Sequence, residues 1–206
     1  MVKQFEDIAA GLADEGFAVA NDFLQAEEVK AILSLPVFKE MEGLRRAGVS
    51  KQGSVHADIR GDYIQWIDPR SAESATQVYL TRLHQLVQHL RQALFISIQD
   101  AELHYTVYPP GTFYKRHLDR FKDDDHRRLS VICYLNQNWK AEDGGQLKIY
   151  LPNGNEVVVL PEAGRLVCFR SELLEHEVLP ATRPRRSITG WLLDCPADLK
   201  HLGPIL

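Results

Sequence analysis

The sequence predicts an α+β fold in which N-terminal helices support a jelly-roll β core. Three observations lead to this prediction. Apolar residues recur at helical spacing through the first half of the chain. After residue 98 the pattern changes to short β-rich runs, and turns containing glycine or proline separate these runs. Helices followed by many short strands are typical of helices packed on a double-sheet β core.

The first half contains three predicted helices. The first has an apolar face formed by Phe5, Ile8, Ala9 and Leu12. It stops near Gly16, and a short strand follows at 17–19. The second runs from Glu27 to Leu35 and is closed by Pro36. Asp68 and Pro69 form an N-cap and first-position pair that is expected to open the longest helix. That helix carries an apolar stripe that should pack on a sheet: Tyr79, Leu83, Leu86, Val87, Leu90 and Leu94.

A long loop is predicted at 43–61, between the second and third helices. It contains several glycines and few large apolar residues, and it ends at Arg60, Gly61 and Asp62. Loops of this length are uncommon in compact domains and often functional. We therefore expect a mobile loop with a role at the site, the alternative being a plain disordered excursion.

The second half is predicted to be all β. The runs lie at 101–108, 113–118, 128–136, 146–151, 156–160, 165–169, 176–179 and 186–193. Asn153-Gly154 is a strong hairpin signal. We expect a single domain over 1–206, with 1–98 as mainly helical support and 99–195 as the β core.

Composition excludes several classes of protein. The chain has 206 residues and a formal net charge of -4, which argues against a general nucleic-acid coat. The longest stretch without charged residues, Leu103 to Tyr114, contains two prolines, so no transmembrane helix is expected. No secretory signal is visible at the N-terminus. Cys133, Cys168 and Cys195 are isolated and odd in number, which favours reduced thiols in a cytoplasmic protein.

Three residues form a candidate metal site. His117 and Asp119 lie two residues apart near the end of a predicted strand, so both side chains should project to one face while Leu118 packs on the other. Alone, this pair is more often a surface salt bridge. His176 at the start of a later strand adds a third ligand. Two histidines and one carboxylate make the facial triad of non-haem Fe(II) oxygenases.

Arg185 begins the last predicted strand. On that strand Arg185, Ser187, Thr189 and Trp191 share one face, and Ile188 and Leu192 take the other. An arginine with hydroxyls on an inner face would make an anion pocket, because a guanidinium holds a carboxylate by two hydrogen bonds. A basic surface run remains the alternative, since Arg183 and Arg186 are close by.

Several stretches together carry a family signature: Ile59 to Trp66, Tyr108 to Asp119, Cys133 to Asn136 with Trp139, Gly144 to Leu147, and His176 to Val178 with Pro180 through Trp191. Through them, the segment from Arg60 to Leu193 resembles the 2-oxoglutarate- and Fe(II)-dependent prolyl hydroxylases. Within these it is similar to the hypoxia-inducible-factor prolyl hydroxylase group and its bacterial relatives.

This resemblance implies a double-stranded β-helix with supporting helices, and it assigns roles to residues. His117, Asp119 and His176 would bind Fe(II). Arg185 would bind the distal carboxylate of 2-oxoglutarate with the help of the Tyr134 hydroxyl. The pocket would be lined by Tyr108, Leu147, Val178 and Trp191. The expected contacts to the substrate, over which the 43–61 loop would close, are Arg60, Arg128 and Trp191.

The implied activity is hydroxylation of a prolyl residue at its 4-position in a protein substrate, with O₂ consumed and succinate and CO₂ released. Ascorbate is left open as a further cofactor. Elongation factor Tu is the leading candidate substrate, and the enzyme is expected to be a cytoplasmic monomer that binds neither membrane nor nucleic acid.

Other interpretations stay open. The same triad could serve a small molecule, a free amino acid or a nucleic-acid base, or the jelly roll could be a non-catalytic metal- or sugar-binding module. Two departures from the family pattern bear on the substrate. The turn from Tyr108 to Gly111 is one residue shorter than in the animal proteins, and the run Asp123 to Asp125 has no counterpart.

Overall fold

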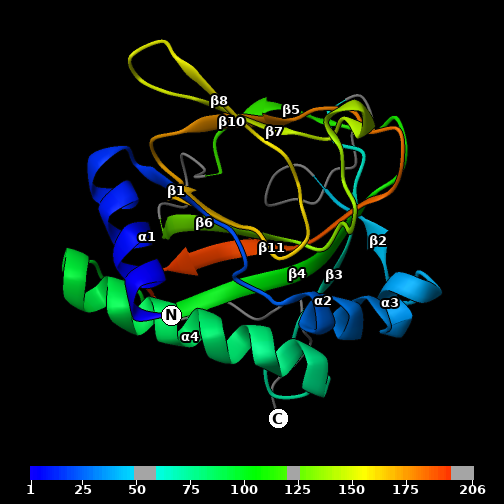
Figure 1. Cartoon of the computed structure of the whole chain (residues 1–206), viewed down its shortest axis with the longest axis horizontal. Helices are drawn as coiled ribbons and strands as arrows, with labels where there is room; N and C mark the ends of the chain where they lie inside the picture. Colours follow the sequence, from blue (N-terminus) through cyan, green and yellow to red (C-terminus); the bar gives the residue numbers. More distant parts are fainter. Residues whose placement is uncertain (49–58, 120–125, 196–206) are drawn as a thin grey trace.

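The chain folds into three layers, with helices below, a large sheet in the middle and a small sheet above (Figure 1). The computed structural model describes residues 1–48, 59–119 and 126–195. The Asp123–Asp125 run and most of the predicted 43–61 loop lie outside these residues. The described helical segments are α1 (Val2–Asp14), α2 (Ala26–Leu33), α3 (Pro36–Lys39), α4 (Ser74–Leu94) and the short 3₁₀ segment η1 (Ala141–Asp143).

The strands form two antiparallel sheets. The seven-stranded sheet has the order β1-β9-β6-β11-β4-β3-β2 and the four-stranded sheet has the order β5-β10-β7-β8. The large sheet comprises β1 (Phe17–Ala20), β2 (Arg45–Arg46), β3 (Tyr63–Trp66), β4 (Asp100–Tyr108), β6 (Arg127–Tyr134), β9 (Leu166–Arg170) and β11 (Arg185–Leu193). The small sheet comprises β5 (Tyr114–His117), β7 (Leu147–Tyr150), β8 (Glu156–Val159) and β10 (Glu175–Val178).

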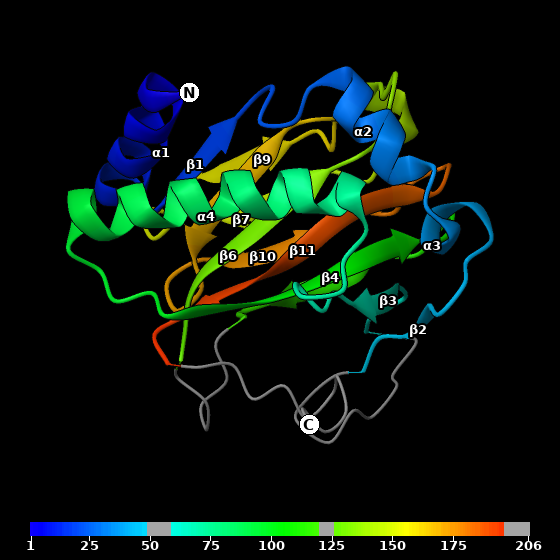
Figure 2. The ribbon, with the colours of Figure 1, turned by 90° about the horizontal axis from the view of Figure 1, so that it is seen from below.

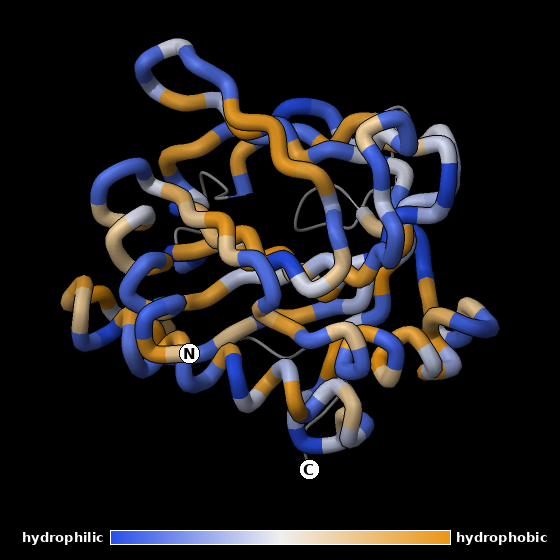
Figure 3. Tube along the Cα trace, in the orientation of Figure 1, coloured by the Kyte–Doolittle hydropathy of each residue, from blue (hydrophilic) through white to orange (hydrophobic). Residues whose placement is uncertain are grey.

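The helices cover the outer face of the large sheet. Figure 2 shows α4 lying across this face, with α1 and α2 on the same side. Along α4 hydrophobic and hydrophilic residues alternate (Figure 3), and the buried ones recur at helical spacing. Tyr79, Leu83, Leu86 and Leu90 are buried in a core that also includes Ile188 and Leu192 of β11. The apolar stripe therefore packs on a sheet, as predicted.

A second apolar cluster fills part of the space between the sheets. Ile132 and Tyr134 contribute from the large sheet, and Leu147, Ile149 and Val178 from the small one. Because successive strand residues point to opposite faces, the central strands serve both clusters at once. This arrangement confirms the predicted α+β fold with two packed sheets and N-terminal helices.

Most predicted elements are present. All eight β runs of the second half are strands, and Asn153-Gly154 lies in the turn of the β7–β8 hairpin, with Gly154 at φ 86. Cys133 and Cys168 are buried free thiols. None of the helices in the described ranges combines the length and apolar character that crossing a bilayer would require.

Some details differ from the sequence predictions. Asp68 and Pro69 do not open α4: the Asp68 carboxylate caps a separate turn by accepting the amide of Arg70 at 3.0 Å, and α4 begins at Ser74. The strands β2 and β3 were not predicted. Leu118 does not pack inward, since its exposed fraction is 39%. It follows the end of β5, where strand alternation no longer applies.

Candidate functional site

A pocket between the two sheets brings together most of the predicted site residues. Its lining includes His117, Asp119, His176 and Arg185. The first two come from the end of β5 and the residues after it, His176 comes from β10, and Arg185 comes from β11. The pairing of β5 with β10 sets His176 directly opposite His117. The small sheet thus carries the candidate metal ligands, and the large sheet carries the arginine.

The three candidate ligands converge. Nε2 of His117 lies 3.5 Å from Oδ1 of Asp119, and Nε2 of His176 lies 3.6 Å from Oδ2 of the same carboxylate. One ligand atom from each residue lies within 4.8 Å of the others. Such spacing suits a divalent cation held by two imidazoles and one carboxylate.

Neighbouring groups hold each ligand in the form that binds metal. Nδ1 of His117 faces the Lys115 carbonyl oxygen at 2.7 Å, and Nδ1 of His176 faces the Leu174 carbonyl oxygen at 3.3 Å. Each carbonyl can accept a proton only from Nδ1–H, which leaves the Nε2 lone pair for a metal. The Ser130 hydroxyl donates to Oδ2 of Asp119 at 2.6 Å and fixes the carboxylate.

The electrostatics of the triad also favour a cation. Burial lowers the pKa of His176 to about 4, with His117 adding to this effect and Asp119 opposing it, so the imidazole is neutral near pH 7. Burial alone would raise the pKa of Asp119, but His176, His117 and the Ser130 hydrogen bond hold that pKa well below its usual range. Neutral histidines and an ionised aspartate are the protonation states that coordinate metal.

Arg185 is buried and not part of a basic surface run, because only 2% of it is exposed. Its Nε donates to the Gly145 carbonyl oxygen at 2.9 Å, and its guanidinium lies 5.2 Å and 4.9 Å from the ring centres of Tyr108 and Tyr134. Its Nη2 and the Tyr134 hydroxyl have no hydrogen-bond partner within the described ranges. A buried cation next to an unpaired hydroxyl is a site for an anion.

Gly145 is required for this arrangement. Its φ is +68, which side-chain-bearing residues rarely adopt, and an added Cβ would lie 3.2 Å from Cδ of Arg185. Leu147 follows two residues later and pairs with Val178 in the sheet register, so both supply an apolar wall of the pocket.

Another part of the pocket lining is organised around Arg60. Its guanidinium donates two hydrogen bonds to the Asp62 carboxylate, at 2.6 and 2.8 Å, and lies 4.8 Å from the ring centre of Tyr114. The Tyr114 ring in turn stacks on His117 at 3.6 Å. A chain of contacts thus connects the predicted substrate residue Arg60 to a candidate metal ligand.

Arg128, which we expected at the substrate, is not among the residues that line the pocket. Its Nε donates to Asp194 at 2.7 Å. The cause is a bulge: the pairing of β6 with β11 skips from Leu129 to Arg127, so side-chain alternation shifts by one residue. Arg127 takes the inner position instead, with its guanidinium 3.4 Å from the centre of the Trp191 ring.

Other features of the site were not found from the sequence. Ser130 could have been recognised, because it alternates with Ile132 and Tyr134 on one face of β6. His104 and Thr106 also line the pocket, although His104 had no partner at metal spacing in the sequence. His126, likewise without an expected partner, lies 3.0 Å from Asp194 and near Cys195, but Arg128 already pairs with that carboxylate.

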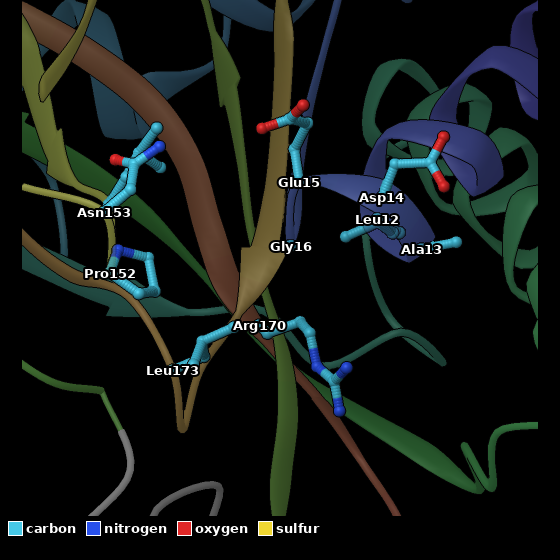
Figure 4. A pocket seen from close by; sticks show the side chains of 10 residues that line it. Leu12, Ala13, Asp14, Glu15, Gly16, Pro152, Asn153, Arg170 and Leu173 are labelled. Atoms are coloured by element: carbon cyan, nitrogen blue, oxygen red, sulfur yellow. The ribbon is translucent and has the colours of Figure 1, made fainter. Parts of the chain in front are cut away.

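A second hollow lies on the surface between the end of α1 and the β7–β8 hairpin (Figure 4). Asp14, Glu15, Asn153 and Arg170 are among its lining residues. The Arg170 side chain is already paired with Glu172 at 3.0 Å. This hollow contains none of the residues that converge in the inner pocket, so the inner pocket is the candidate site.

Comparison with known proteins agrees with this geometry. A model of the 2OG-Fe(II) oxygenase superfamily matches residues 103–193. A solved prolyl-4-hydroxylase from Pseudomonas putida is 42% identical, with a TM-score of 0.85, over 93% of this chain and 100% of that chain. A prolyl hydroxylase from Trichoplax adhaerens, solved with a hypoxia-inducible factor peptide fragment, is 27% identical with a TM-score of 0.84, over 98% of this chain and 94% of that one.

A curated relative from Caenorhabditis elegans, a hypoxia-inducible factor prolyl hydroxylase, is 31% identical over 92% of this chain. The chain spans only 28% of the length of that relative. The similarity therefore covers the region that contains the pocket and says nothing of the rest of the longer protein.

Proposed function

Because this chain belongs to the 2OG-Fe(II) oxygenase superfamily, and within it to the prolyl hydroxylases, we propose that it hydroxylates a prolyl residue in a protein substrate. One observation carries the proposal: a convergent His/Asp/His group and a buried, unpaired arginine share one pocket between the sheets. The first arrangement suits Fe(II), and the second suits the dicarboxylate co-substrate 2-oxoglutarate.

The residues present fit both groups. His117, Asp119 and His176 would hold the metal through two neutral imidazoles and one ionised carboxylate. Arg185 would hold the distal carboxylate of 2-oxoglutarate, and the Tyr134 hydroxyl, whose pKa is raised by burial more than Arg185 lowers it, stays protonated and can donate to the same carboxylate. When bound, Fe(II) and 2-oxoglutarate supply the oxidising chemistry, in which O₂ is split between the C–H bond of the substrate and succinate, with release of CO₂.

The protein's own part is binding and exclusion of water. Leu147, Val178 and Trp191 give the pocket apolar walls, which strengthen the electrostatic attraction of Arg185 for an anion. Tyr108 packs beside the guanidinium and keeps it in place. Arg60, held by Asp62, and Trp191 both line the pocket and would contact the peptide.

We further propose that hydroxylation occurs at the prolyl 4-position and that elongation factor Tu is a candidate substrate. Support comes from the likeness to the bacterial prolyl-4-hydroxylase, which covers most of this chain. Ascorbate would act as a reductant in solution, and we assign no described residue to its binding.

Mass spectrometry tests the proposal directly. Purified protein with Fe(II), 2-oxoglutarate and O₂ should add one oxygen atom to a proline of elongation factor Tu and release succinate in equal amount. Fragmentation locates the oxygen, and an oxygen on any other residue would contradict the prolyl assignment. A nucleoside or a free amino acid serving as the better substrate would favour the rival oxygenase activities.

Arg185→Ala provides the test of the anion pocket. We expect a higher 2-oxoglutarate requirement by a factor of about 10 to 100, because a hydrogen bond to a charged group contributes roughly 1.5–3 kcal/mol. An unchanged apparent affinity would remove Arg185 from this role while leaving the metal assignment intact.

A further inference from the structure

His104 lies in the middle of β4 and lines the same pocket as the triad. In the register of the large sheet it stands opposite Trp66 on one side and Thr189 on the other. Only 1% of it is exposed. A histidine so deeply buried at the wall of a site needs a hydrogen-bond partner for each ring nitrogen or pays a desolvation cost.

Only one of its ring nitrogens is satisfied. Nδ1 lies 2.8 Å from Oγ1 of Thr106, on the same face of β4. Nε2 is buried and has no hydrogen-bond partner in the part of the chain that the structure describes, and the same holds for Nε1 of Trp191. The two rings are neighbours, with their centres 5.6 Å apart. Two neighbouring rings of the pocket wall therefore each carry an unsatisfied nitrogen.

Charged groups of both signs lie near this pair: Arg127 and Arg60, each paired with a carboxylate, and Asp119 of the same pocket. The Arg127 guanidinium lies 3.4 Å from the centre of the Trp191 ring. Burial, followed by the charges of Arg60 and Arg127, lowers the pKa of His104 to about 3, so the imidazole is neutral under physiological conditions. A neutral imidazole beside an indole can present two N–H donors, which favours an occupant with acceptor oxygens over a cation.

We propose that His104 and Trp191 bind the metal-proximal carboxylate of the 2-oxo acid, so that this protein holds the co-substrate at both ends. This inference rests on the proposed function. Arg185, Thr189 and Trp191 share the inner face of β11, and His104 stands opposite Thr189. A dicarboxylate anchored by Arg185 thus extends along this face towards His104. With the Thr106 hydroxyl donating to Nδ1, Nε2–H of His104 becomes a donor, and Nε1–H of the neighbouring Trp191 ring supplies a second one.

Anaerobic titration of the Fe(II)-loaded protein with 2-oxoglutarate tests this assignment. The chelate of Fe(II) and a 2-oxo acid has a weak charge-transfer absorption band, which reports both affinity and the surroundings of the metal-proximal carboxylate. We expect His104→Phe to weaken binding about tenfold, as loss of a hydrogen bond to a charged group does, and to move the band maximum. Arg185→Ala should weaken binding without moving the band, because its contact is remote from the chelate.

Two further variants separate a direct contact from a general packing effect. His104→Gln keeps an N–H donor and should restore most of the affinity and the wild-type band position. Thr106→Val removes the partner of Nδ1 and should reproduce part of the His104→Phe effect. Thermal unfolding of each metal-free variant identifies any that fails to fold. If one of these two variants does not fold, the other one still tests the direct contact.

The outcomes are distinct. An unchanged affinity and band in His104→Phe, or weaker binding with an unmoved band as in Arg185→Ala, would overturn the assignment. If His104→Phe raised only the concentration of protein substrate that is required, His104 would contact the substrate, and the assignment to 2-oxoglutarate would also be overturned. A wild-type protein without any charge-transfer band would instead refute 2-oxoglutarate binding itself, and with it the proposed function.

Discussion

The two faces of the large sheet differ in how completely their polar groups are satisfied. The helix-covered face is largely apolar, and its buried side-chain groups without a partner among the described residues are the Tyr79 hydroxyl and Oε1 of Gln65, which stands opposite Tyr105 of that core. The pocket face, formed by the same strands, carries four buried side-chain atoms without a hydrogen-bond partner among the described residues: His104 Nε2, Tyr134 OH, Arg185 Nη2 and Trp191 Nε1. Polar groups that the fold leaves unsatisfied are thus concentrated where a ligand can satisfy them.

The same strands therefore contribute to stability through one face and to the candidate site through the other. Along β11, Ile188 and Leu192 enter the helix-side core, whereas Arg185 and Thr189 line the pocket. Strand alternation alone produces this division. Substitutions on the pocket face should therefore change the chemistry, and substitutions on the helix-covered face should change the stability.

Loss of a metal ligand should have the largest effect on chemistry. His176→Ala should lower substrate-dependent succinate production by more than about 100-fold, because even outer-shell partners of a metal site typically contribute 10–100-fold. The thermal midpoint of the metal-free protein should stay close to wild type, since water can fill the vacated part of an open pocket. Substantial retained turnover in a coupled succinate assay would show that the triad assignment is wrong.

The opposite pattern is expected on the helix side. Leu86 of α4 is fully buried against the sheet, so Leu86→Ala should lower the free energy of unfolding by about 2–5 kcal/mol, as typical for buried leucines. The affinity for 2-oxoglutarate should not change. Val78→Ala on the exposed side of the same helix is the control, with an expected change within about 0.5 kcal/mol. Equal effects of the two substitutions in urea unfolding would argue against the packing described for α4.

The pH dependence of stability should reveal the buried His104. The pKa of His104 is about 3 in the folded state and about 6.5 in the unfolded state. At pH values between these two, the imidazole is protonated in the unfolded chain and neutral in the folded protein. Stability is therefore fully present above pH 6.5 and declines as the pH falls. When the pH is lowered from 7 to 5, the free energy of unfolding of His104→Phe should fall by about 2 kcal/mol less than that of wild type, measured by urea unfolding of the metal-free proteins. Parallel pH profiles would contradict the burial of a neutral imidazole.

The smallest effect is expected at a residue next to another candidate metal ligand. Arg116 precedes His117 but points away from the pocket, pairing with Glu175 at a solvent-exposed position. Arg116→Gln should change the free energy of unfolding by less than about 0.5 kcal/mol, because exposed ion pairs contribute little. Its 2-oxoglutarate affinity, measured by the same anaerobic titration, should match wild type, and a large decrease would mean that β5 is oriented differently.

The sequence predicted those parts of the molecule that depend on local pattern. Short β-rich runs and turn residues located every strand of the second half, and the spacing of His117, Asp119, His176 and Arg185 identified the residues that converge in the pocket. The resemblance placed Arg128 at the substrate, but its side chain does not line the pocket, because β6 contains a bulge that only strand pairing reveals. The strand β3 was missed because Tyr63 to Trp66 shows little apolar alternation of its own and is defined only by its pairing with β4 and β2.

His104 illustrates a different limit. Within the sequence it is an isolated histidine in a β run, and nothing local separates it from a histidine that simply packs. Its position opposite Thr189 and next to Trp191 depends on which strands become neighbours. A buried polar atom without a hydrogen-bond partner cannot be predicted from the sequence, because only the packing of the strands decides which groups lie near it.

The buried guanidinium of Arg185 has a consequence for the lifetime of the protein in a cell. Its Nη2 has no hydrogen-bond partner among the described residues, so without a bound anion the protein carries part of the desolvation cost of a buried charge. A dianion that binds only the folded state removes that cost and shifts the population towards it by mass action. Turnover by proteases acts on the unfolded population, so the abundance of this enzyme would rise and fall with the supply of its own co-substrate.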